Sequence, residues 1–190
     1  MTNEEIIQLL IKYSGIPKGY QNKTVSDFQA KSALTSTLKS TVVKYVNEFS
    51  ENNGAGLYIY SEQNGTGKTH LSCAAGIAII KKYQSLPRFI TVTEMTNKIK
   101  QAFDTNKDIL KKYRECDLLI FDDFGSEKVT EWTEETVFSV LDYREKNILP
   151  TIFTSNLKVE DLKYNNRIKS RIRGNTASLK AGNIDHRKLK

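Results

Sequence analysis

Residues 64–69 read Asn-Gly-Thr-Gly-Lys-Thr, and they lie between a short apolar run at 57–60 and a segment of helical spacing at 67–83. A glycine-rich turn between a strand and a helix lets several backbone N–H groups point at one anion, and the helix dipole adds to that attraction. Lys68 can reach the β- and γ-phosphates of a nucleotide, and Thr69 can offer its hydroxyl to Mg²⁺. The stretch therefore predicts a nucleotide site lined by Asn64, Gly65, Thr66, Gly67, Lys68, Thr69 and, as a structural neighbour, His70.

The match to the phosphate-loop pattern G-x-x-x-x-G-K-[ST] departs at one position, where Glu62 replaces the first glycine. This position lies at the mouth of the loop, so the departure weakens the match only modestly. The alternative is a glycine-rich turn with a lysine present by chance. The strand and the helix expected on either side argue against that alternative.

A second apolar run, Leu118–Phe121, ends in two carboxylates, Asp122 and Asp123. Such a strand is typical of the metal-binding strand of a phosphate-loop enzyme. We expect Asp122 to hold Mg²⁺ through water, with burial on the strand and a nearby cation keeping it ionised, and Asp123 to orient or deprotonate the attacking water. Alone, the run would indicate a strand that ends at the surface. Because many hydrolysing enzymes of this kind use Glu where this chain has Asp123, we expect slow turnover.

A further strand, expected at Thr151–Thr154, is followed by Asn156, which could lie beside the attacking water and the γ-phosphate. The alternative is an asparagine in an ordinary turn.

Farther along, Arg167 and Arg171 are spaced i and i+4 and share one face of an expected helix. They could act in trans on a neighbouring subunit's nucleotide as an arginine finger, or they could be solvated or paired with acids.

Strands and helices alternate through most of the chain, which predicts a three-layer α/β fold with a central parallel sheet covered on both faces. The expected strands are 57–60, 88–93, 118–121 and 151–154. The expected helices are 3–13 with Asn3 as its cap, 33–49, 67–83, 94–103, 107–115, 132–147 and 158–172. Residues 18–29 read as irregular.

The length of 190 residues fits one domain, and the net charge is +7. Residues 157–190 hold ten Lys or Arg and three Asp or Glu, so the whole excess of positive charge lies in this segment. Such a segment suits either a solvated face or the binding of a polyanion.

Two cysteines and two histidines exclude a disulfide framework and disfavour a zinc site. The acidic N-terminus and the lack of a long apolar run disfavour a secretory signal and a membrane span, so we expect a cytoplasmic protein. A second group of basic residues follows the expected strand at 88–93. A solvated face is the better interpretation of this group, and contact with DNA is the alternative. Its members are Lys98, Lys100, Lys107, Lys111, Lys112 and Arg114.

In this order, the motifs resemble the ATPase core of DnaC/DnaI-type bacterial or phage replicative helicase loaders, which are AAA+ proteins, and the related IstB transposition ATPases. The similar segments are Gly15–Pro17 with Tyr20, the Walker A motif 64–71, the Walker B motif 119–127, sensor I at 151–157, an Arg-x-x-Ser-Arg box at 167–171 and a sensor II segment at 185–187. The resemblance implies that Arg171 is the finger, with Arg167 as a second candidate, and that Arg187 contacts the nucleotide. Loaders of this family usually have a helicase-binding domain before the core, whereas 14 residues precede Gly15 here.

We therefore expect a short N-terminal helix at 1–14 and a three-layer P-loop NTPase domain of AAA+ type at 15–190, without a separate C-terminal lid. The expected cofactors are ATP and Mg²⁺, and the expected partners are a ring helicase, single-stranded DNA and further copies of the chain, but no membrane. The function implied by the resemblance is ATP-dependent helicase loading. The alternatives are an IstB-like ATPase that assists a transposase, and a non-catalytic ATP-binding adaptor or inhibitor of the replication machinery.

Overall fold

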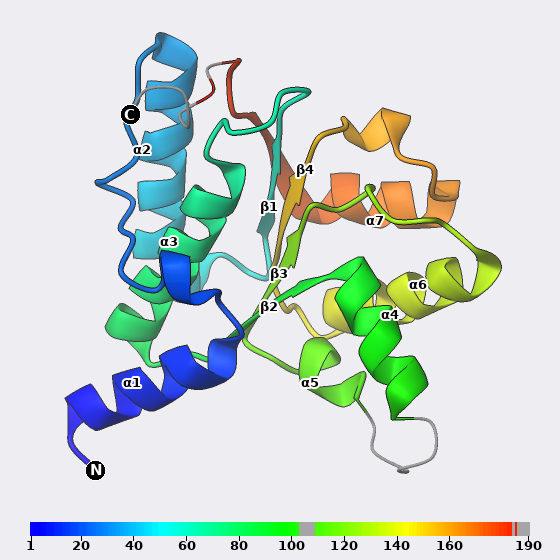
Figure 1. Ribbon diagram of the computed structural model, residues 1–190, viewed down its shortest axis with the longest axis horizontal. Helices are drawn as coiled ribbons and strands as arrows, with labels where there is room; N and C mark the ends of the chain where they lie inside the picture. Colours follow the sequence, from blue (N-terminus) through cyan, green and yellow to red (C-terminus); the bar gives the residue numbers. More distant parts are fainter. Residues whose placement is uncertain (103–108, 184, 186–190) are drawn as a thin grey trace.

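The computed structural model describes residues 1–102, 109–183 and 185, and it shows a parallel sheet between two layers of helices (Figure 1). The strand order is β2-β3-β4-β1-β5. The strands are β1 Gly56–Tyr60, β2 Pro87–Thr91, β3 Leu118–Asp122, β4 Thr151–Ser155 and β5 Thr176–Lys180. The helices are α1 Asn3–Ser14, η1 Lys18–Tyr20, α2 Ala33–Asn47, η2 Phe49–Glu51, α3 Lys68–Tyr83, α4 Val92–Gln101, α5 Lys111–Arg114, α6 Glu131–Lys146, η4 Val159–Asp161 and α7 Asn166–Asn175.

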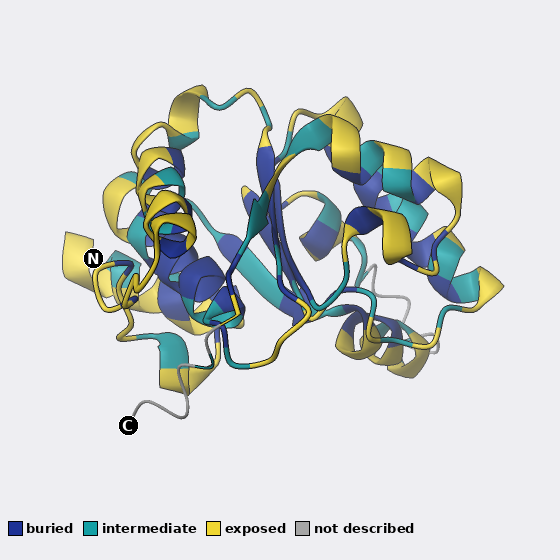
Figure 2. Ribbon diagram, turned by 90° about the horizontal axis from the view of Figure 1, so that it is seen from above, coloured by how far each residue is buried: buried dark blue, intermediate teal, exposed yellow. Residues whose placement is uncertain are grey.

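Strands β1 to β4 have apolar side chains on both faces, and a hydrophobic core lies on each side of the sheet (Figure 2), with a third, smaller cluster between α1 and α3. Along β1, Leu57 and Ile59 belong to the core under α2 and α3, whereas Tyr58 belongs to the core under α4, α6 and α7. Because side chains alternate across a strand, a continuous apolar run can fill both cores only when helices cover both faces. The predicted three-layer α/β class is confirmed.

The N-terminal helix α1 packs on α3 and β2 rather than standing apart. Its cap is Thr2 and not the expected Asn3, because the Thr2 side chain accepts the Glu5 N–H in a capping box. Gly15 ends the helix with φ 78°. A side chain there would meet the Phe89 carbonyl oxygen at 2.9 Å, so this turn requires glycine.

The second strand is shorter than expected, because β2 ends at Thr91 and α4 begins at Val92. The Thr91 hydroxyl accepts the Glu94 N–H at 3.1 Å and so caps α4 in the middle of the β-branched run. The expected helix at 158–172 is also wrong in part. It divides into η4 and α7, and Asn165 starts α7 by accepting the Ile168 N–H at 3.2 Å.

Strand β5 was not predicted from the sequence. It pairs in parallel with β1 at the edge of the sheet, and most of its residues are at least partly exposed. An edge strand of this kind lacks the apolar run by which buried strands are detected, and its pairing rather than its composition makes it a strand.

Helix α6 is fixed to the sheet by a buried cation, Arg144, which is 1% exposed. Its guanidinium donates to the carbonyl oxygens of Tyr113 at 3.1 Å, Cys116 at 2.8 Å and Pro150 at 2.5 Å. These oxygens lie in α5 and in the loops before β3 and β4. Since a charge is tolerated in the interior only when its hydrogen bonds are satisfied, Arg144 ties α6 to the ends of the strands opposite the phosphate loop.

Among the residues that the structure describes, no helix combines the length and the apolarity that crossing a membrane requires.

Candidate nucleotide site

The phosphate loop follows β1 and leads directly into α3, as the sequence predicts. Gly65 and Gly67 have φ values of 74° and 86°, which only glycine adopts readily. Lys68, the first residue of α3, is 8% exposed. Its ammonium donates to the carbonyl oxygens of Gln63 at 3.0 Å and Ser61 at 3.3 Å, so the lysine closes the loop upon itself. An anion in the loop would find this charge and the N-terminus of α3 together.

Asp122 lies at the end of β3, beside the loop. Its Oδ1 accepts hydrogen bonds from Thr69 Oγ1 at 2.8 Å and Thr154 Oγ1 at 2.6 Å. Burial raises the pKa of Asp122, and the bonds from Thr154 and Thr69 and the charge of Lys68 only partly oppose it. The expectation that burial helps to keep this carboxylate ionised is therefore wrong, because burial disfavours the charged form and the charge of Lys68 offsets it only in part.

The oxygens of Thr69 and Asp122 suit Mg²⁺, which takes few protein ligands and completes its shell with water and phosphate oxygens. Bound there, Mg²⁺ would neutralise phosphate charge and add the cation that favours an ionised Asp122. Among the described residues there is no cluster of three or more His, Cys, Asp or Glu that could hold a metal by itself. This pair is therefore suited to a metal that arrives with a nucleotide.

Asp123 and Asn156 meet at the mouth of the site. Asn156 Nδ2 donates to Asp123 Oδ1 at 3.0 Å, and Asn156 Oδ1 accepts from Lys68 Nζ at 2.9 Å. Asp123 has φ 53°, and its N–H donates to Thr154 Oγ1 at 2.9 Å. A left-handed backbone at an aspartate is uncommon, and here hydrogen bonds from β4 hold it. The strand order explains the meeting, because β4 lies between β1 and β3.

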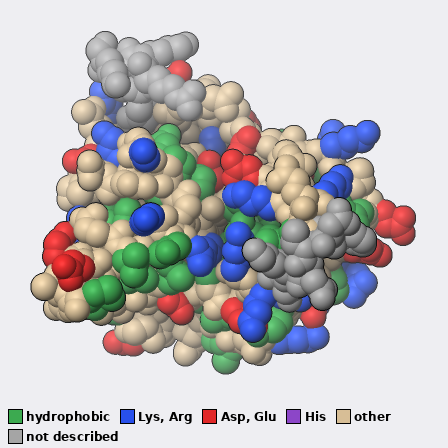
Figure 3. Space-filling model, turned by 60° about the horizontal axis from the view of Figure 1, so that its bottom comes forward, with side chains coloured by type: hydrophobic (Ala, Val, Ile, Leu, Met, Phe, Trp, Pro, Cys, Tyr) green, Lys and Arg blue, Asp and Glu red, His purple; other side chains and the backbone are tan. Residues whose placement is uncertain are grey.

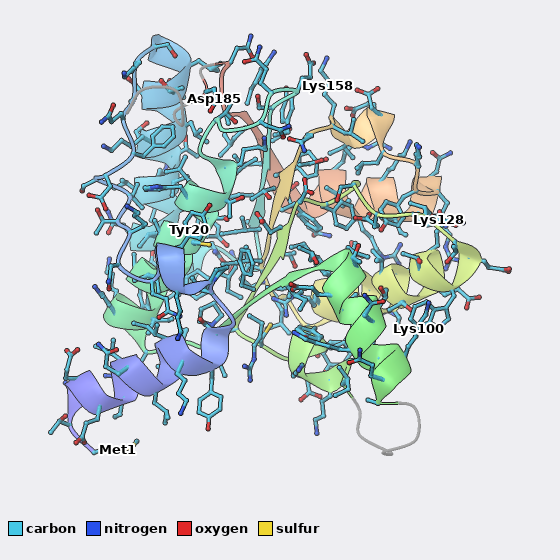
Figure 4. The ribbon with its side chains drawn as sticks, in the orientation of Figure 1. Met1, Tyr20, Lys100, Lys128, Lys158 and Asp185 are labelled. Carbon is cyan, nitrogen blue, oxygen red and sulfur yellow. The ribbon has the colours of Figure 1, made fainter. Side chains whose placement is uncertain are left out.

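These side chains line one cavity of about 770 Å³, a size that suits a nucleotide. The wall opposite the strands comes from the segment after α1, where Figure 4 labels Tyr20. His70 belongs to this wall, and its Nε2 lies 2.9 Å from the Thr24 carbonyl oxygen, which is a structural position. Sequence reasoning missed Lys23, Asp27, Phe28, Gln29, Phe89 and Thr154. Only the entry segment, Gly15–Pro17 with Tyr20, gave a signal for this wall. Lys23, Asp27, Phe28 and Gln29 reach the cavity through the folding of an irregular segment, whereas Phe89 lies on β2 and Thr154 on β4.

The segment after β5 reaches the phosphate loop. A Cβ on Gly65 would lie 1.9 Å from Asp185 Oδ1, so the missing side chain makes room for this carboxylate. Figure 4 labels Asp185 at that side of the molecule. The two other members of the expected sensor II segment, His186 and Arg187, lie outside the described residues.

The arginines of α7 do not line this cavity. Arg171 forms ion pairs with Asp142 at 2.5 Å and Glu145 at 3.1 Å, both on α6. The guanidinium carbons of Arg167 and Arg171 lie 4.1 and 4.4 Å from the centre of the Phe138 ring. Arg167 is exposed, whereas Arg171 is only partly so. Of the expected site residues that the structure describes, these two alone lie apart from the cavity.

Comparison with known proteins agrees with the assignment of this cavity as a nucleotide site. A family model described as "IstB-like ATP binding protein" matches residues 12–165. The replicative helicase loader DnaI of Bacillus subtilis is 31% identical over 140 residues, covering 72% of this chain and 43% of that protein. The replicative helicase loader DnaC of Escherichia coli K12 is 25% identical over 160 residues, covering 82% and 64%. The chain thus spans about half to two-thirds of the length of these curated relatives.

Solved structures agree with the fold. A crystal structure of the DnaC helicase loader superposes with a TM-score of 0.80 and 27% identity, covering 86% of this chain and 99% of that chain. A replication initiator DnaA bound to AMPPCP and single-stranded DNA has a TM-score of 0.71 at 22% identity, covering 86% of this chain and 50% of that one, which supports the fold alone. The resemblance seen in the motifs is therefore confirmed, and the chain belongs to the family of IstB-like ATP-binding proteins, with the P-loop AAA+ fold of the DnaC and DnaI helicase loaders.

Proposed function

We propose that this chain binds and hydrolyses MgATP and uses it in loading a ring helicase onto single-stranded DNA. The single observation that supports hydrolysis best is the position of Asn156, which hydrogen-bonds both Lys68 and Asp123. A γ-phosphate bound at Lys68 and a water held by Asp123 would therefore lie on either side of one amide.

Each residue then has a defined task. The backbone N–H groups of the loop and the Lys68 ammonium bind the phosphates, and Thr69 and Asp122 hold Mg²⁺. Asp123 accepts a proton from the attacking water, and Asn156 orients that water. The aspartate side chain is one methylene shorter than glutamate, so we keep the expectation of slow turnover.

The site is completed by a neighbouring copy in this proposal. Arginine supplied in trans can stabilise the charge that develops on the transferred phosphoryl group. Arg167 is the more available of the two candidates, because Arg171 would have to leave Asp142 and Glu145 before it could reach a neighbour. ATP would then control self-assembly, since the nucleotide lies where the copies meet.

The helicase partner is supported by the names of the relatives, which are helicase loaders. A basic surface supports the DNA partner. Lys112 is so placed that burial and the charges of Lys98 and Arg88 lower its pKa. Figure 3 shows Lys and Arg side chains gathered near the middle of the face that it draws. Contact with phosphates would relieve this repulsion, and it predicts binding that weakens as salt rises.

An IstB-like role beside a transposase is the second candidate, favoured by the family model itself. The third is a non-catalytic adaptor that binds ATP and occupies a helicase or a loader. In all three cases we assign residues 1–14 to an N-terminal helix and 15–190 to the ATPase domain.

Turnover separates the catalytic roles from the adaptor. We expect purified wild-type protein to release phosphate from MgATP and Lys68→Ala to lose this activity, whereas Lys81→Ala, an exposed lysine on the same helix, keeps it. Equal release by wild type and Lys68→Ala would contradict the proposal. Capture of purified ring helicases, with and without ATP, then distinguishes a loader from a transposase partner. ATP-dependent capture of a transposase alone would favour the second candidate.

A further inference from the structure

Three contacts join the loop after β3 to the segment that precedes α7. Phe124 stacks on Tyr164 with ring centres 5.0 Å apart and 22° between the planes. A Cβ on Gly125 would lie 2.5 Å from Leu162 Cδ2, so the loop is pressed against this segment. Tyr164 Oη donates to Glu127 Oε1 at 2.5 Å. Phe124, Leu162 and Tyr164 are each at most 3% exposed.

Glu127 is the centre of this contact. Both of its carboxylate oxygens accept the Gly125 N–H, at 3.0 and 3.1 Å, so it closes the turn that begins at Asp123. Burial raises the pKa of Glu127, while the bonds from Tyr164 and the Gly125 backbone oppose this. Burial likewise raises the pKa of Tyr164, so the phenol remains a donor. In Figure 4, the label of Lys128 marks the loop that follows Glu127.

The other end of the contact is the start of α7. Asn165, next to Tyr164, accepts the Ile168 N–H at 3.2 Å and donates its own N–H to Glu134 of α6 at 2.7 Å. The residue that caps α7 is therefore adjacent to the tyrosine that holds Glu127. Asp123 occupies the other end of the same short turn, where it meets Asn156.

We infer that Glu127 and Tyr164 are positioning residues that couple the nucleotide site to α7, so that occupation of the site changes the placement of the arginine box. The inference rests on the proposed function, since it gives the site a nucleotide and the box a task. Neither side chain touches the cavity. Their link is a partly buried hydrogen bond, which holds one geometry more firmly than an exposed bond does.

The test is amide hydrogen exchange with and without a non-hydrolysable ATP analogue and Mg²⁺. In wild-type protein we expect the analogue to slow exchange in the phosphate loop and to change it in residues 165–171. In Tyr164→Phe, which keeps the stacked ring and removes the hydroxyl, we expect the loop to respond as before and α7 to lose its response. Tyr143→Phe is the matched control, because it removes an exposed hydroxyl that bonds Glu115 at 3.4 Å.

Turnover gives a second readout. We expect Tyr164→Phe to lower kcat about tenfold and to leave KM within about twofold, as for other residues that orient catalytic groups. Glu127→Gln and the double variant complete a cycle, and the double variant should cost little more than either single change.

Each other outcome is decisive. An α7 response that persists in Tyr164→Phe, or that is absent in wild type, overturns the inference and leaves the proposed function standing. Loss of the loop response as well as the α7 response in Tyr164→Phe overturns it too, because the residue would then be structural only. If wild type shows no response even in the loop, the proposed function itself has failed.

Discussion

The phosphate-loop edge of the sheet and the arginine face of α7 contain the same kinds of charged groups, yet their contacts differ. At the sheet edge, Lys68 donates to the carbonyl oxygens of Ser61 and Gln63 and to the amide oxygen of Asn156. On α7, Arg171 is paired with two carboxylates of α6. The loop lysine thus lies among the groups that would hold a phosphate, whereas Arg171 is already paired with two acids. One half of the proposed active site is ready within a single chain, and the other half would have to exchange partners.

The largest expected effect concerns Arg144, which supports α6, the helix that carries Asp142 and Glu145. Arg144→Met removes the donor from several buried carbonyl oxygens, so we expect the free energy of unfolding to fall by about 3–4 kcal/mol. Urea denaturation measures it. Lys146→Met, an exposed change on the same helix, should cost less than about 1 kcal/mol. Equal losses in the two variants would mean that Arg144 does not tie α6 to the sheet.

The next prediction concerns the prepared half of the proposed active site, which is the phosphate-loop edge with Lys68, Asp123 and Asn156. Asp123→Asn keeps the volume and an oxygen for Asn156 but removes the proton acceptor, so we expect kcat to fall about 100-fold or more. Nucleotide affinity should change little, because the phosphate contacts remain. Steady-state turnover and analogue binding measure the two effects, with the exposed Asp161→Asn as control. Normal turnover in Asp123→Asn would remove its role as base.

A pair of variants compares the two arginines. Arg167→Ala should reduce turnover about tenfold or more at high protein concentration and little in dilute protein, because in the proposed function this arginine acts between copies. Arg171→Ala should lower the free energy of unfolding by about 1 kcal/mol through its lost ion pairs. The concentration dependence of turnover and urea denaturation separate the two roles. If Arg171→Ala alone abolishes the concentration dependence, Arg171 is the finger despite its pairing.

The smallest effect concerns pH. Hydrogen bonds from Lys146 and Arg171 lower the pKa of Asp142. Folding therefore favours the ionised form, and this stabilisation exists above the ordinary carboxyl pKa and disappears as pH falls through the lowered value. We expect Asp142→Asn to be less stable than wild type near pH 7, and the difference to shrink as pH falls below the ordinary carboxyl pKa. A difference that is constant with pH would show that the charge of Asp142 does not matter.

Most of the prepared half was predictable from the sequence, because its residues stand in short motifs. The loop glycines, Lys68 and Thr69 are contiguous, and Asp122 and Asp123 end an apolar strand. The hydrogen bonds of Asn156 were less predictable, since they require β4 to lie between β1 and β3. Thr154, which bonds Asp122 and the Asp123 backbone, gave no signal, because one threonine in a strand resembles any other.

The sequence alone determined the fold class, the phosphate loop and the carboxylate strand, because glycine freedom, helix capping and apolar runs act over a few neighbouring residues. Only the tertiary structure decided that β5 joins the sheet, that Arg171 is paired with α6 and that Tyr164 holds Glu127. Those contacts join residues far apart in the chain. They depend on strand order and on how helices pack, which no local pattern specifies.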